Sequence, residues 1–143
     1  MLSKYIESAD WTKEKHVPVI DCPDSVEMGE PVLVTVTVGR EIPHPNEPGH
    51  FISWIALYYL PTNAKAPIEL ARCAFSAHGA GTTEGLGPVA LSVPMMKVVF
   101  RPNAPGKLYA TAYCNLHGLW ESEKAITSLF HPIPSLDAAV CNK

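Results

Sequence analysis

Four side chains in this sequence are of types that bind transition metals and lie at spacings suited to one shared ion. Cys114 and His117 are three residues apart in C-N-L-H-G, so both can reach one ion across a turn ending at Gly118. His44 and His50 frame the segment H-P-N-E-P-G-H, whose prolines restrict the main chain. Imidazole is the commonest protein ligand for metals, and a thiolate adds a soft, charge-donating bond. The two pairs therefore indicate a metal site.

A further histidine, His16, ends the polar segment W-T-K-E-K-H and precedes an apolar one. Taken alone, a histidine near a proline is more often structural than a ligand. The four cysteines form no C-x-x-C pair, which argues against a zinc ribbon, a rubredoxin-type centre and a thioredoxin-like redox pair. The other histidines and cysteines have no partner at ligand spacing, and we expect them to be structural: His78, His131, Cys22, Cys73 and Cys141.

Composition excludes some classes of partner. The formal charge is −3 and there is no basic run, so we expect no nucleic-acid partner. No segment approaches the roughly 20 apolar residues of a membrane span. The N-terminal residues also lack the apolar region of a signal peptide. We therefore expect a cytoplasmic protein that does not bind membranes.

Short apolar runs, separated by 14 prolines and 9 glycines, must position these side chains. The runs are rich in β-branched and aromatic residues, and the clearest alternates apolar and polar positions, which predicts strands. Seven short strands predict an all-β, immunoglobulin-like sandwich in one domain over residues 1–130, followed by an irregular C-terminal tail at 131–143. The predicted strands are residues 31–38, 51–60, 68–75, 89–93, 97–101, 107–114 and 119–129.

Three segments together resemble the active-site motifs of the superoxide reductase family, which comprises the neelaredoxins and the catalytic domain of the desulfoferrodoxins. One departure is E-P-G between Asn46 and His50, where family members often carry a threonine-rich version, although the spacing of the two histidines is kept. The cysteine-rich iron domain of desulfoferrodoxins has no counterpart, so the resemblance is to the single-iron form. The segments are A-D-W-T-K-E-K-H-V-P-V-I, V-T-V-G-R-E-I-P-H-P-N-E-P-G-H-F-I-S-W-I and Y-C-N-L-H-G-L-W-E-S-E.

The resemblance implies one mononuclear non-haem iron per chain with an open sixth position. It implies a superoxide reductase, an oxidoreductase that reduces superoxide by one electron to hydrogen peroxide and is re-reduced by a donor such as rubredoxin. Relatives are often dimers or tetramers, so a homo-oligomer is expected. Glu14 and Lys15 match the family's mobile charged pair near the open position. The implied ligands are His16, His44, His50 and His117 in the equatorial plane and Cys114 as the axial thiolate.

Two alternatives fit part of the pattern. A cupredoxin-like blue-copper electron carrier is also a β-sandwich with a C-x-x-H segment near its end, but it usually supplies a methionine a few residues later. Here the residues after Gly118 are L-W-E-S-E, and two histidines would be left without a role. A metal-free immunoglobulin-like interaction domain would explain the strands but not the grouping of histidines.

Overall fold

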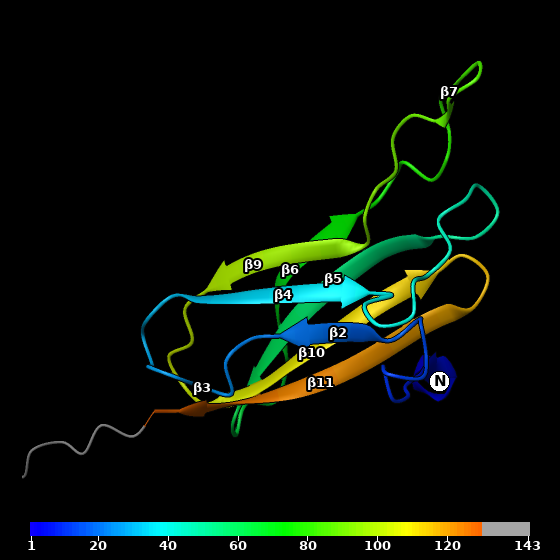
Figure 1. Cartoon of the computed structure of the whole chain (residues 1–143). Helices are drawn as coiled ribbons and strands as arrows, with labels where there is room; N and C mark the ends of the chain where they lie inside the picture. The colour runs from blue at the N-terminus through cyan, green and yellow to red at the C-terminus, as the bar shows by residue number, and fades with distance from the viewer. Residues whose placement is uncertain (130–143) are drawn as a thin grey trace, which may run out of the picture.

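The computed structural model describes residues 1–129, so the predicted tail at 131–143 lies outside the described residues, as do His131 and Cys141. The described chain is built almost entirely of strands, which confirms the expected all-β class (Figure 1). Among residues 1–129, no helix has the length and apolar character needed to cross a membrane. The elements are η1 (Leu2–Tyr5), β1 (Ile6–Glu7), β2 (Pro18–Asp21), β3 (Ser25–Val26), β4 (Val32–Val38), β5 (Ile52–Pro61), β6 (Ile68–Ala74), β7 (Thr82–Thr83), β8 (Gly87–Pro88), β9 (Met95–Phe100), β10 (Gly106–Cys114) and β11 (Gly118–Ser128).

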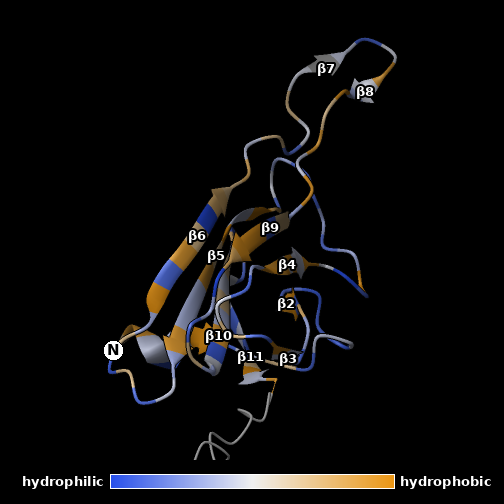
Figure 2. Cartoon of the chain, turned by 90° about the vertical axis from the view of Figure 1, so that its left-hand side faces the viewer, coloured by the Kyte–Doolittle hydropathy of each residue, from blue (hydrophilic) through white to orange (hydrophobic). Residues whose placement is uncertain are grey.

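Two sheets pack face to face as a sandwich (Figure 1). The larger sheet has the strand order β1-β11-β10-β5-β6, with β3 also paired to β11, and the smaller has the order β2-β4-β9. β7 and β8 form a separate two-stranded sheet that projects away from the sandwich (Figure 2). One buried cluster takes side chains from both large sheets and forms the core between them.

Strict alternation in the sequence explains the strands that border the core. In β4, the valines at every second position are buried, while Leu33 between them is 52% exposed. In β10, Leu108, Ala110, Ala112 and Cys114 form the inward stripe, because side chains of a strand point alternately to its two faces. This period of two directs the thiol of Cys114 inward at the end of its strand.

The strand predicted at residues 89–93 is wrong. Val89 and Val93 are 56% and 66% exposed, so this apolar stretch has no core to face. Pro88 and Pro94 lie on either side of it and cannot donate a main-chain hydrogen bond. The only pairing found for the stretch within the described chain is an isolated bridge between Leu91 and His78. The two large sheets contain nine strands, six of which were predicted. The other three, β1, β2 and β3, are too short to be recognised from periodicity.

The strand registers place several chain reversals at one end of the sandwich. Pro18 at the start of β2 pairs with Val38 at the end of β4. Cys114 at the end of β10 pairs with both Gly118 at the start of β11 and Ile52 at the start of β5. The segments that immediately precede or follow these residues therefore meet at this end, and they carry the predicted ligands.

Candidate metal centre

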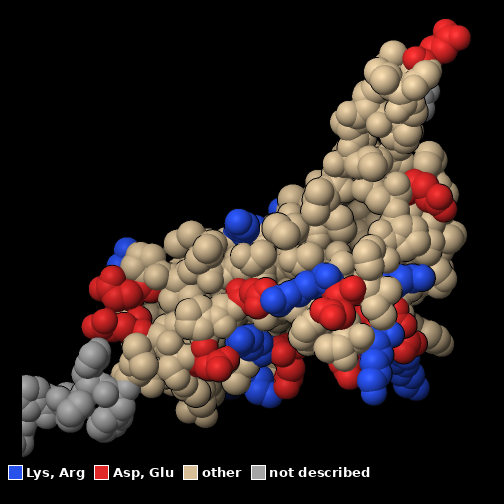
Figure 3. Space-filling model, viewed as in Figure 1, with Lys and Arg blue, Asp and Glu red and all other residues tan. Residues whose placement is uncertain are grey.

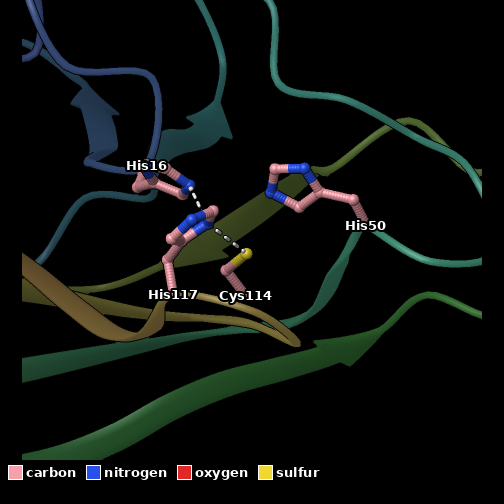
Figure 4. Close-up of side chains that lie close together, drawn as sticks. All are labelled: His16, His50, Cys114 and His117. Carbon is pink, nitrogen blue, oxygen red and sulfur yellow. Dashed lines mark hydrogen bonds between the residues drawn. The ribbon is translucent and has the colours of Figure 1, made fainter.

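Four of the predicted ligands converge at this end of the sandwich. One nitrogen from each of His16, His50 and His117 and the sulfur of Cys114 all lie within 4.8 Å of one another. Figure 4 shows the four side chains pointing toward a common region from different parts of the chain. The structure thus brings together residues that are distant in sequence, as the metal-site prediction required.

The tight turn between β10 and β11 supplies two of these side chains. Cys114 is fully buried, and its Sγ lies 3.6 Å from Nδ1 of His117. Gly118 closes the turn with a φ of +79°, a conformation that glycine adopts without the strain other residues incur. Because the ladder continues to the pair Cys114–Gly118, the relative position of thiol and imidazole follows from the hairpin itself.

His16 enters from the segment before β2 and is only 5% exposed. Its Nδ1 lies 2.6 Å from Oε1 of Glu14, so this nitrogen donates to the carboxylate and leaves Nε2 with a free lone pair. That Nε2 lies 3.1 Å from Nδ1 of His117. Nitrogen ligands bind metals at about 2.0–2.1 Å, so two nitrogens this close can share one ion.

His44 and His50 come from the connection between β4 and β5. Nδ1 of His44 donates to the carbonyl oxygen of Pro45 at 2.6 Å, so its Nε2 carries the free lone pair. The His44 ring centroid lies 4.8 Å from that of His16 and 4.7 Å from that of His50. His44 is therefore adjacent to the four-residue cluster, although its ligand atom is not among those that lie within 4.8 Å of one another.

Two buried nitrogen atoms in this group have no hydrogen-bond partner in the described part of the chain. They are Nε2 of His44 and Nε2 of His50. Leaving a buried polar atom without a partner costs about 1–3 kcal/mol, so such atoms usually have a specific reason. A metal ion bound to both lone pairs supplies that reason, and four imidazoles with one thiolate form a donor set that suits redox-active iron. The residues present therefore fit the iron that the family resemblance implies.

Burial lowers the pKa of three of the histidines, His16, His44 and His50, and so favours the neutral form that binds metals. It lowers the pKa of His44 to about 4, against a hydrogen bond to Pro45 that acts in the opposite direction. It also lowers the pKa values of His16 and His50. The positive charge of Lys15 lowers the pKa of all three rings further. Neutral imidazole is the metal-binding form, so protons compete weakly for these nitrogens.

Glu14 lies beside the cluster and not in it. Its carboxylate also accepts a hydrogen bond from the main-chain nitrogen of His16 at 3.2 Å. Burial alone would raise the pKa of this carboxyl, but the hydrogen bonds with the ring and main chain of His16 outweigh burial and lower it. A carboxylate hydrogen bonded to the far nitrogen of a ligating histidine fixes the orientation of the ring and strengthens it as a donor.

Comparison with known proteins shows the family to which the chain belongs. Residues 8–123 match the family model described as Desulfoferrodoxin. The chain belongs to the desulfoferrodoxin family. A superoxide reductase of Pyrococcus abyssi is 46% identical over 123 residues, covering 86% of this chain and 96% of the relative. The neelaredoxin of Megalodesulfovibrio gigas is 42% identical over 123 residues, covering 84% and 92%.

Solved structures of the desulfoferrodoxin family share the fold. The crystal structure of a putative superoxide reductase from Thermotoga maritima matches with a TM-score of 0.83 and 41% identity, covering 91% of this chain and 98% of that one. The reduced neelaredoxin of Archaeoglobus fulgidus matches with a TM-score of 0.75 and 42% identity, covering 86% and 98%. Membership of this family disfavours both the blue-copper carrier and the metal-free interaction domain.

Sequence reasoning missed several residues around the site. The indole of Trp120 stacks on His16 with centroids 5.0 Å apart, and its Nε1 donates to the carbonyl oxygen of His117 at 3.2 Å. Asn115 hydrogen bonds the segment that carries His44 and His50. Asn46 lies within that segment and ties it to the carbonyl oxygen of Ser92. Both asparagines lie inside the motifs that contain the predicted ligands, and this position is the only feature of the sequence that could have pointed to a role in the site. A tryptophan in a strand gives none, because strand tryptophans commonly pack without any site.

His78 has the structural role expected of it. Its ring nitrogens lie 2.8 Å from Oδ1 of Asn46 and 2.8 Å from the carbonyl oxygen of Phe75. The ring also stacks on Phe51 with centroids 3.9 Å apart. Cys22 and Cys73 are free thiols away from the cluster.

Proposed function

We propose that this chain is a superoxide reductase that binds one iron ion through four histidines and one cysteine. The reaction takes one superoxide anion, one electron and two protons to one molecule of hydrogen peroxide, and no dioxygen is released. The observation that carries the proposal is the convergence of imidazole nitrogens on a buried thiol, with two buried nitrogens left unpartnered. The proposed ligands are His16, His44, His50, His117 and Cys114.

Each group of the chain has a definite task in this proposal. The imidazoles hold the ion in a neutral shell, and the thiolate contributes one negative charge. When bound, iron in this shell supplies one electron at a time to superoxide. Cys114 is proposed to set how readily that electron leaves, because the identity and environment of a thiolate ligand tune the potential of iron.

Lys15 is proposed to attract the substrate. On the face shown in Figure 3, basic and acidic side chains are interspersed, and the net charge of the chain is −3. The protein as a whole therefore does not favour an anion, and attraction must come from charge near the site. Lys15 directly precedes the buried His16, and its positive charge acts to lower the pKa of His16, His44 and His50.

Glu14 is proposed to have two positions. In the described one it hydrogen bonds His16 through the side chain and main chain. If iron were held here and oxidised, the site would carry one more positive charge, and the carboxylate of Glu14 would be available to bind and partly neutralise it. A one-electron donor such as rubredoxin then returns the electron. We further propose that the enzyme is cytoplasmic and works as a dimer or tetramer.

Metal analysis and a visible spectrum test the proposed function. We expect about one iron per chain and, in the oxidised protein, a sulfur-to-iron charge-transfer band that Cys114→Ser removes. Superoxide should be consumed with formation of hydrogen peroxide and without release of dioxygen. Stoichiometric copper, a band that survives Cys114→Ser, or dioxygen release would each overturn the proposal.

A rate measurement tests Lys15. We expect Lys15→Ala to slow the reaction with superoxide by about tenfold and to flatten its dependence on salt, because local charge steers anions to a site. Iron content should stay the same. Lys13→Ala is the matched control, since it removes the same charge from an exposed side chain two positions away. A rate for Lys15→Ala equal to that of the control would remove Lys15 from the mechanism.

A further inference from the structure

We propose that Asn115 is a positioning residue for His50: its side-chain amide holds the main chain on both sides of this histidine at a set distance from Cys114 and His117. The proposal rests on the metal site of the proposed function. It concerns how that site is held in place before a metal binds. None of the roles proposed above includes this residue.

The side chain of Asn115 bonds the two peptide groups that flank His50. Its Oδ1 accepts a hydrogen bond from the main-chain nitrogen of Phe51 at 2.8 Å. Its Nδ2 donates to the carbonyl oxygen of Gly49 at 2.9 Å. The main-chain nitrogen of Asn115 adds a third bond, to the carbonyl oxygen of Phe51 at 3.2 Å. One residue therefore anchors the chain before and after His50.

The remaining main-chain groups of His50 are also occupied. Its nitrogen donates to the carbonyl oxygen of Glu47 at 3.0 Å, and its own carbonyl oxygen accepts from the nitrogen of Glu47 at 3.1 Å. These bonds and those to Asn115 restrain the main chain at residues 49–51 on both sides of His50. The main chain that carries the imidazole is thus held by Asn115 from the turn between β10 and β11 and by Glu47 from within its own loop.

These bonds of Asn115, which we call the clamp, lie where the regular pairing of β10 with β5 is interrupted. Tyr113 pairs with Trp54, but Cys114 pairs with Ile52, so the register between β10 and β5 slips by one residue next to the site. Regular pairing ends there, since β5 begins at Ile52. The side-chain amide of Asn115 has one donor and one acceptor group, like a peptide group. Its bonds to Phe51 and Gly49 therefore extend the hydrogen bonding beyond the register shift, as far as the residues that flank His50.

Only an amide suits both contacts. A carboxylate of the same shape accepts from Phe51 but repels the carbonyl oxygen of Gly49, because it has no hydrogen to donate. Alanine removes both bonds, each worth about 1 kcal/mol. We therefore expect Asn115→Ala and Asn115→Asp to displace His50 relative to the thiolate.

The first measurement is the affinity for Fe²⁺, determined without oxygen against a competing chelator. Loss of groups that orient metal ligands typically weakens metal binding by about 10–100-fold, and we expect a loss in this range for Asn115→Ala. In a His50→Ala background the same substitution should have little further effect, because Asn115 acts through that ring. Asn103→Ala is the matched control, since this exposed asparagine precedes β10 and Asn115 follows it.

The second measurement needs no metal. Hydrogen exchange at the Phe51 amide of the iron-free protein should accelerate in Asn115→Ala and less in Asn115→Asp, which keeps the acceptor. If the wild type binds no iron, the proposed function fails, yet this measurement still decides the clamp. Unchanged exchange at Phe51, or an affinity loss as large in the His50→Ala background as in the wild type, would overturn the inference. If Asn115→Ala does not fold, Asn115→Asp serves for both measurements.

Discussion

The turn that carries Cys114 and His117 and the connection that carries His44 and His50 each provide two proposed ligands, but they are built by different means. The turn follows directly from the pairing of β10 with β11, which continues to Cys114 and Gly118. The connection spans the gap between β4 and β5 and has only one isolated bridge, within its own loop. Its shape depends on bonds to Asn115 and, through Asn46, to the segment before β9.

The difference shows two ways of placing a ligand. In the turn, geometry comes from neighbours in sequence, so a short motif contains the information. In the connection, geometry comes from residues far away in the chain, and the same histidine spacing would be compatible with many shapes. We expect the connection to be the more sensitive region to substitutions outside the ligands themselves.

A matched pair of glycines tests this expectation with the largest effect. Gly39 and Gly118 have φ values of +78° and +79°, so alanine costs each about 1–2 kcal/mol of backbone strain. A Cβ at Gly118 meets nothing within 4 Å, whereas at Gly39 it would lie 2.6 Å from the nitrogen of His44. Urea denaturation should therefore show a larger decrease in the free energy of unfolding for Gly39→Ala than for Gly118→Ala. Of the two variants, only Gly39→Ala should have a reduced iron content. Equal losses would break the comparison.

Asn46 gives an effect of intermediate size. Its Nδ2 donates to the carbonyl oxygen of Ser92 at 2.7 Å, and its Oδ1 faces His78 at 2.8 Å. Asn46→Ala frees the connection from this contact, and we expect iron affinity to fall by about tenfold. Chelator competition measures this change. An affinity equal to that of Asn103→Ala would mean that this side of the connection needs no support.

Iron removal gives the smallest effect. The hairpin ladder is made of main-chain pairs, whereas the connection would lose two of its anchors if the proposed ligands His44 and His50 were released. Amide exchange in residues 40–50 should rise by about three- to tenfold on chelation, and the amides at the ends of β10 and β11 should change less. Exchange that rises equally in both regions would show that the turn relies on the metal as much as the connection does.

Much of the fold was predictable, because alternation is a local property. The valines of β4 and the stripe from Leu108 to Cys114 show their buried faces directly in the sequence. The stretch at 89–93 has similar apolar residues, yet it lies between Pro88 and Pro94 and has no sheet to join. Composition alone cannot separate the two cases, since a strand needs a partner as well as a suitable pattern.

The sequence by itself determined which side chains were available to bind a metal, because donor type and spacing within a turn are written in neighbouring residues. Only the tertiary structure decided which end of the sandwich collects the three segments, which nitrogen of each ring faces inward, and which residues hold them there. The contacts of Glu14 with His16, of Trp120 with His16 and of Asn115 with Gly49 illustrate this. The physical reason is that ring orientation and loop shape depend on hydrogen bonds and packing between residues that only the folded chain brings into contact.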